Sequence, residues 1–281
     1  MGNHYVPRYY LRGFSPNFGN QVWAYDRDAR RKFYSHVVNV GQENSLYSDD
    51  LEAMLTQDIE GPANNILDKI RDKEELTSND KVLLSVYLIT LWKRVPEGKR
   101  RVNDRMPEVS QEIGNKVHSE IDRIISEEPE FKKLGLKRKE EVDDIIARYK
   151  DNPPDDIWHQ TISPELSPRI IEHIPKMAWV FFYAKEPMSF LTCDNPVFYF
   201  KHLGVGNPTS EFSVPMNGEV VLWATNRQDV KEGYYEASNS VVKEFNRRTA
   251  SNSTRFVYAG IDHTWIEEFV YKGSWHLNLI Q

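Results

Sequence analysis

The chain has 281 residues, of which 36 are Lys or Arg, 42 are Asp or Glu, and 12% are aromatic. This composition is typical of a globular protein and excludes a collagen, a disulfide-rich scaffold and a polar disordered tail. The formal net charge of −6 argues against a dedicated DNA-binding module, because such domains are usually strongly basic.

The expected elements begin with a short helix that starts at Pro7 and ends at Gly13 within an aromatic N-terminal segment. A β-hairpin follows, because apolar runs at 22–25 and 31–38 flank the polar turn 26–29. We therefore expect the N-terminal segment to be docked on the core.

Two helices are expected next. Apolar side chains recur every three or four residues over 50–70, which predicts an amphipathic helix with a kink or a restart at Pro62. A second helix is expected from Thr77, because Thr77 and Asp80 form a capping-box pattern just before an apolar run. This run is apolar nearly all round, so we expect the helix to be buried.

Residues 97–150 carry 13 basic and 13 acidic side chains and few aromatic ones. Such a pattern is typical of exposed helices with ion pairs between side chains four residues apart. We expect a charged helical insertion or lid that protrudes as a hairpin from a single domain spanning 1–281, with its bend at 127–129 and 132–136. A proline-containing connector is expected at 151–168.

The second half has the apolar runs and turns of a β-rich region. Helices are expected at 168–176 and 230–250. Strands are expected at 179–183 and 189–192, joined by a turn at 185–187, and at 197–200, 220–223 and 256–258. The fold class is α+β: a helical first half with the protruding arm, packed on a mainly antiparallel β-sheet formed largely by the second half.

The lone cysteine, Cys193, excludes an internal disulfide. The first twenty residues hold charged and turn residues where a signal peptide needs an apolar run. The longest apolar segments, near 82–92 and 178–184, fall well short of the roughly 20 residues of a membrane span. We expect a cytoplasmic protein with no membrane partner.

Residues 192–197 form the strongest local motif, because a buried strand runs there into Asp194 and Asn195 and then into Pro196. The end of a strand holds such side chains rigidly at the edge of a core, where they often carry chemistry. The alternative is a turn closed by the Asp and Asn side chains themselves. Cys193 has no basic neighbour in sequence and is interpreted as a small buried residue.

Three further polar residues are candidates for a site. The imidazole of His4 is suited to acid–base chemistry or to metal binding, with a structural role as the alternative. Glu60 and Arg94 both lie on apolar rows of their helices. They form either a buried ion pair between the helices or a catalytic carboxylate with an anion-binding Arg. The basic run 93–101 fits a nucleic-acid contact or a helix end that complements its own dipole.

Three parts of the sequence together resemble one family, the microbial domain of unknown function 4238. They are the N-terminal His-x-Val-Pro block with Tyr10, Leu11 and Phe14, the motif at 192–197, and residues 214–216 with Asn246. The resemblance extends from His4 to about Tyr258. It implies that the polar positions of the family pattern are His4, Glu60, Arg94, Asp194 and Asn246, with Cys193 where serine is frequent. It supplies no reaction.

These residues suggest a hydrolase of a phosphodiester or nucleotide substrate, such as a nuclease with a toxin-like or phage-defence role. In this hypothesis His4, Glu60 and Asp194 hold a divalent ion, Mg²⁺ or Mn²⁺, or orient water. Arg94 binds the phosphate, while Asn195 and Asn246 complete the site. The alternative is a non-catalytic sensor or protein-interaction module that uses the charged 97–150 arm, with the polar set as a structural network.

Overall fold

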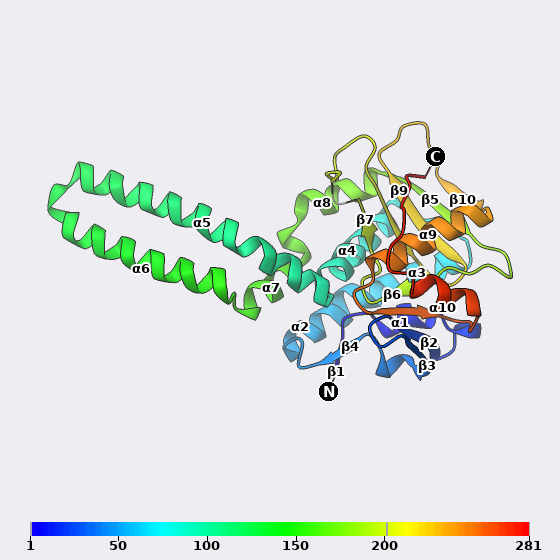
Figure 1. The fold of residues 1–281 in the computed structure, drawn as a ribbon. Helices are drawn as coiled ribbons and strands as arrows, with labels where there is room; N and C mark the ends of the chain where they lie inside the picture. Colours follow the sequence, from blue (N-terminus) through cyan, green and yellow to red (C-terminus); the bar gives the residue numbers. More distant parts are fainter. Residues whose placement is uncertain (1, 201, 281) are drawn as a thin grey trace. The chain divides into compact units, whose positions relative to one another are not determined.

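The computed structural model describes residues 2–200 and 202–280 and confirms the α+β class. Its contacts divide the chain into two compact units, each described by itself. The main unit comprises Met1–Val95 and Ser163–Gln281, and the hairpin unit comprises Pro96–Ile162. Figure 1 shows both. Within the described residues, no helix has both the length and the apolar character needed to cross a membrane.

The N-terminal elements of the main unit follow the expected order. They are β1 (Gly2–His4), α1 (Arg8–Arg12), η1 (Pro16–Phe18), β2 (Gln21–Asp26), β3 (Arg31–His36), η2 (Val37–Asn39) and β4 (Gln42–Asn44). Pro7 precedes α1 and Gly13 ends it, as predicted. Strand β3 is two residues shorter than predicted, because the imidazole of His36 accepts a hydrogen bond from the Val38 N–H and caps η2.

Four helical segments follow: α2 (Asp49–Met54), the π-helical η3 (Leu55–Glu60), α3 (Gly61–Arg71) and α4 (Ser78–Arg94). The switch from η3 to α3 at Gly61 confirms the helix restart predicted at Pro62. The capping box of Thr77 and Asp80 is also present. Helix α4 is largely buried and ends at Arg94, one of the candidate site residues.

The strands of the main unit form three sheets rather than one. Strands β1 and β4 form a short pair, and β3-β2-β11-β6 form a four-stranded antiparallel sheet. The third sheet has the order β10-β5-β9-β8-β7, in which β10 and β5 are parallel. The strands from the second half are β5 (Ala178–Tyr183), β6 (Thr192–Cys193), β7 (Phe198–Tyr199), β8 (Glu211–Pro215), β9 (Val220–Thr225), β10 (Gly233–Glu236) and β11 (Phe256–Ala259).

Two sequence predictions in this region are wrong. Only Thr192 of the run 189–192 lies in a strand, because β6 spans Thr192–Cys193 and the N–H of Phe190 donates outside the sheets, to the carbonyl oxygen of Gly218. Residues 230–237 are not helical either. They contain β10, where Tyr234 stacks on Phe181 of β5 at 4.8 Å between ring centroids. Helix α9 (Asn239–Asn252) starts after its N-cap, Ser238.

The remaining helices of the main unit are short. They are η5 (Pro164–Leu166), α8 (Pro168–His173), η6 (Ile174–Lys176) and α10 (Thr264–Val270). Segments α8 and η6 together match the helix predicted at 168–176. Figure 1 shows α9 and α10 in orange and red, toward the C-terminal end of the chain.

The hairpin unit is an antiparallel helix pair with one further helix. Its elements are α5 (Pro96–Glu127), η4 (Pro129–Phe131), α6 (Lys132–Asp151) and α7 (Asp155–Ile162). Ion pairs cross between α5 and α6, including Lys139 with Asp122 at 2.6 Å. The bend lies at 127–131, whereas 132–136 are helical, which corrects part of the prediction. The connector predicted at 151–168 contains α7 and η5.

Candidate functional site

His4 lies at the end of β1, half-buried, and is held through both its ring and its main chain. The ring nitrogen Nε2 is 3.1 Å from the carbonyl oxygen of Val38. The carbonyl oxygen of His4 accepts a hydrogen bond from the guanidinium of Arg94. Burial lowers the pKa of His4, and the nearby charges of Arg8 and Arg94 lower it further, against the bond to Val38. The imidazole is therefore neutral at pH 7.

Glu60 and Arg94 form the ion pair that their helical rows suggested. Nη1 of Arg94 lies 2.5 Å from Oε1 of Glu60, and the Arg94 side chain is 1% exposed. The hydroxyl of Tyr47 donates to the carbonyl oxygen of Arg94. Burial is the largest single influence on Arg94 and lowers its pKa, but the charge of Glu60 and the interactions with Tyr47 together outweigh burial and raise the pKa. The pair joins the end of η3 to the end of α4.

Glu52 is a second carboxylate beside this pair, and the sequence did not single it out. Burial raises the pKa of Glu52, while the charge of Arg94 opposes the rise. In residues 2–200 and 202–280, Glu52 Oε2, Tyr87 Oη and Arg94 Nε are buried without a hydrogen-bond partner. Glu52 lies in the first turn of α2, where acidic residues are common. Its position in the sequence therefore did not indicate that it lies near Arg94.

Asp194 follows β6 directly, and its carboxylate binds main-chain N–H groups at the start of β11. Oδ1 accepts from Thr254 at 2.8 Å, and Oδ2 accepts from Arg255 at 2.7 Å and from Phe256 at 2.9 Å. Asp194 is 3% exposed. Burial raises its pKa, and the three N–H donors act against that rise. The carboxylate thus connects two neighbouring strands of the four-stranded sheet.

The two asparagines also bind main-chain groups. Asn246, on α9, accepts from the N–H of Leu191 and donates to the carbonyl oxygen of Ser189, both at 2.9 Å. Asn195 donates to the carbonyl oxygen of Asn252 at 3.0 Å. Together they attach α9 to the segment around β6. This arrangement fits the structural role that the sequence left open beside the catalytic one.

The predicted residues therefore fall into two groups. The side chains of Glu60 and Arg94 meet the main-chain carbonyl group of His4 at the ends of η3 and α4. The second group, Asp194, Asn195 and Asn246, surrounds β6. Among the described residues, no three or more His, Cys, Asp or Glu side chains are grouped so that they could hold a metal ion. His4, Glu60 and Asp194 accordingly do not form one set of metal ligands.

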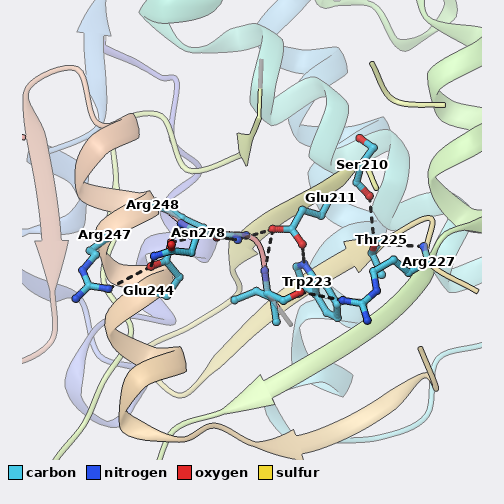
Figure 2. A network of polar contacts seen from close by, with 10 residues as sticks. Ser210, Glu211, Trp223, Thr225, Arg227, Glu244, Arg247, Arg248 and Asn278 are labelled. Atoms are coloured by element: carbon cyan, nitrogen blue, oxygen red, sulfur yellow. Dashed lines mark hydrogen bonds and ion pairs between the residues drawn. The ribbon is translucent and has the colours of Figure 1, made fainter. Parts of the chain in front are cut away.

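The main unit contains a larger network of buried charges that was not predicted from the sequence (Figure 2). Glu211 of β8 and Arg248 of α9 form an ion pair whose side chains are 2% and 1% exposed. The Trp223 indole donates to Glu211 at 2.7 Å, and Arg248 donates to the carbonyl oxygen of Asn278 at 2.6 Å. Glu244 accepts from the N–H of Asn278 at 2.8 Å. The network attaches the C-terminal segment to the main unit.

One signal for this network was present in the sequence. Glu244 and Arg248 lie one turn apart on α9, and Phe245 beside them is buried. Charged residues on a row next to a buried aromatic need a buried partner. That partner, Glu211, comes from a strand 37 residues earlier, so spacing within α9 could not identify it.

Asn246 also lines a groove between α9 and α10, with a volume of about 500 Å³. Lys243 and Arg247 of α9 lie on one side of this groove. Trp265 and Phe269 of α10 lie on the other. A predicted site residue thus borders a pocket whose volume suits a small ligand.

The fold and these polar groups define an α+β protein whose candidate residues bind mainly the protein's own main chain. The chain belongs to the DUF4238 family of proteins of unknown function, whose family model matches residues 3–263. This match confirms the resemblance found in the His-x-Val-Pro and Asp194 motifs. No curated protein and no solved structure matches the chain.

Proposed function

We propose that this protein is a non-catalytic protein-interaction module that pairs with a second copy of itself through one face of the α5–α6 hairpin. The observation that carries the proposal is exposed apolar surface. Fifteen large hydrophobic side chains are exposed in the described residues, and seven of them belong to the hairpin unit, about a quarter of the chain. Apolar surface gathered in this way is typical of protein-binding sites.

Most of these side chains share one face of the hairpin. The seam between the helices is marked by glycines: a Cβ on Gly114 would lie 2.0 Å from Ile146, and one on Gly135 would lie 2.6 Å from Ile125. Four exposed residues each come directly before one of these seam residues. They are Ile113, Ile124, Leu134 and Ile145.

A two-fold axis perpendicular to both helices relates the members of an antiparallel pair. Residues that precede the seam by one position therefore point to the same side on α5 and on α6. Val117 lies one turn after Ile113 and extends the row on α5. We name the five residues the apolar face: Ile113, Val117, Ile124, Leu134 and Ile145.

The charges of the hairpin favour a second copy as the occupant. On α5, residues 97–111 have a net charge of +1 and 112–128 of −3. On α6, residues 130–139 have a net charge of +4 and 140–150 of −2. When the apolar faces of two copies pack together about a two-fold axis, α5 of one copy lies on either α5 or α6 of the other copy. In both cases the two helices in contact are antiparallel. Both arrangements bring a negative segment against a positive one.

The hydrolase hypothesis stays a prediction. The oxygens of Asp194 accept main-chain hydrogen bonds, and Glu60 is paired with Arg94, so a catalytic role would require these groups to change partners. These contacts favour the non-catalytic proposal.

The test is Leu134→Glu, with Leu136→Glu as its matched control. Both leucines are 51% exposed, yet they lie about 200° apart around α6. A charge placed in an apolar interface costs about 2 kcal/mol or more, so Leu134→Glu should raise the Kd of the pair by about 30-fold or more. Leu136→Glu should leave it unchanged. Sedimentation velocity over a range of concentrations measures both.

Two results would contradict the proposal. One is a wild-type chain that sediments as a monomer at every concentration. The other is a dimer that both substitutions weaken equally, because the apolar face would then have no special role. Circular dichroism checks that each variant keeps its helix content, which is expected since both side chains are exposed.

A further inference from the structure

The groove between α9 and α10 combines positive charge with aromatic rings. Its cations are Lys243, Arg247 and Lys272, against the single carboxylate of Glu268. This gives the groove a local net charge of +2 in a chain whose net charge is −6. Concentrated positive charge on an acidic protein attracts anionic ligands to that place.

The two lysines of the groove are available to a ligand. Both are exposed, and neither ammonium group has an ion pair or a side-chain hydrogen bond within residues 2–200 and 202–280. Arg247 is paired with Glu244 through Nη1 at 3.2 Å, which leaves the other nitrogens of its guanidinium free to donate. Lys243 and Arg247 lie one turn apart on α9, so their charges converge on one region.

The aromatic wall, formed by Trp265, Phe269 and Trp275, supplies apolar ring surface beside these charges. Trp265 and Phe269 lie 6.2 Å apart, and Phe269 and Trp275 lie 6.1 Å apart, measured between ring centroids. Each of the three rings is partly exposed. The indole nitrogen of Trp275 is buried and has no acceptor among the described residues. A buried donor without an acceptor is rare, and a bound ligand is one way to satisfy it.

We propose that this groove binds a free nucleotide, with its base against the aromatic wall and its phosphates on the lysines and Arg247. Stacking of a base on an aromatic side chain contributes about 1–3 kcal/mol and does not require a particular base. Lys and Arg are the usual partners of phosphate groups. A volume of about 500 Å³ lies within the range of small-molecule sites.

This site is separate from the apolar face, and each can fail without the other. The groove belongs to the main unit and the apolar face to the hairpin unit. Leu134→Glu should therefore bind nucleotides with wild-type affinity. The overall charge of −6 favours a free nucleotide over a nucleic-acid strand, because a strand presents many phosphates to the rest of an acidic surface.

The experiment is isothermal titration calorimetry of the full chain with ATP, GTP, CTP and UTP. Adenosine and inorganic triphosphate serve as probes of the two halves of the ligand. We expect ATP to bind at least about tenfold more tightly than either half, because both the base and the phosphates contribute. The affinity for ATP should fall as salt is added.

Variants then assign the binding to this groove. The double variant Lys243→Ala/Lys272→Ala should weaken ATP binding at least about tenfold and leave adenosine binding unchanged. Both lysines are exposed, so this variant should keep its wild-type melting temperature. Lys231→Ala, an exposed lysine of the main unit outside the groove, is the matched control. Trp265→Ala should weaken ATP and adenosine alike, and Trp265→Phe should restore part of both.

Three outcomes would overturn the proposal. They are absence of binding for all four nucleotides at about 1 mM, binding of ATP that is unchanged in the double lysine variant, and tighter binding of a single-stranded oligonucleotide than of any free nucleotide. The last would replace the free nucleotide by a nucleic-acid strand as the ligand.

Discussion

Replacing Asp194 by alanine tests whether its carboxylate has a structural or a catalytic role. The substitution removes the buried carboxylate that accepts hydrogen bonds from three main-chain N–H groups, those of Thr254, Arg255 and Phe256. A hydrogen bond to a charged group contributes about 1.5–3 kcal/mol. The expected loss is thus at least about 3 kcal/mol, a large part of the 5–15 kcal/mol that typically stabilises a folded domain.

Urea unfolding followed by tryptophan fluorescence measures this loss as a lower midpoint at an unchanged slope. Asp28→Ala is the control, because the Asp28 side chain is 73% exposed and lies near the same strands; its loss should stay within about 0.5 kcal/mol. The reasoning fails if Asp194→Ala unfolds within about 1 kcal/mol of the wild type. A folded, stable Asp194→Ala protein would make Asp194 available for chemistry and would revive the hydrolase hypothesis.

Two further predictions concern the cluster at the end of α4. Arg94→Met should lower the free energy of unfolding by about 3 kcal/mol or more, because it leaves Glu60 unpaired. Adding Glu60→Leu should recover part of this loss. If urea or thermal unfolding shows that the losses of the two single variants simply add, the two side chains are not coupled. The pKa of His4 is lower in the folded chain than its ordinary value of 6.5, so the unfolded state binds the proton first as the pH falls. Wild-type stability should therefore decrease relative to His4→Gln below about pH 6.5, and parallel stability curves from pH 7.5 to 5 would show that His4 does not titrate differently on folding.

Local signals predicted much of the fold. The capping box of Thr77 and Asp80 and the restart near Pro62 depend on residues within one or two turns, and both are present. Strand β10 could not be found in this way. Its pairing with β5 joins residues about fifty positions apart, and this non-local contact overrides the helical pattern that continues into α9.

The candidate site shows the same limit for polar residues. Glu60 and Arg94 could be paired from the sequence, because each carries its charge on an apolar row of a helix. The partners of Asp194 lie some sixty residues later and are main-chain groups, which have no signature in residue type. An aspartate that holds strands together and one that performs catalysis look alike in a sequence until their partners are known.

The buried network of Glu211 and Arg248 has a consequence for the order in which the protein forms during synthesis. Arg248 donates to the carbonyl oxygen of Asn278, and Arg227 donates to that of Ile280 at 3.0 Å. Residues 278–280 leave the ribosome after every strand of the sheet that they help to close. A nascent chain that lacks residue 278 carries the Arg248 guanidinium without the carbonyl oxygen of Asn278 as an acceptor. The interior of the main unit is therefore complete only after residues 278–280 have been synthesised.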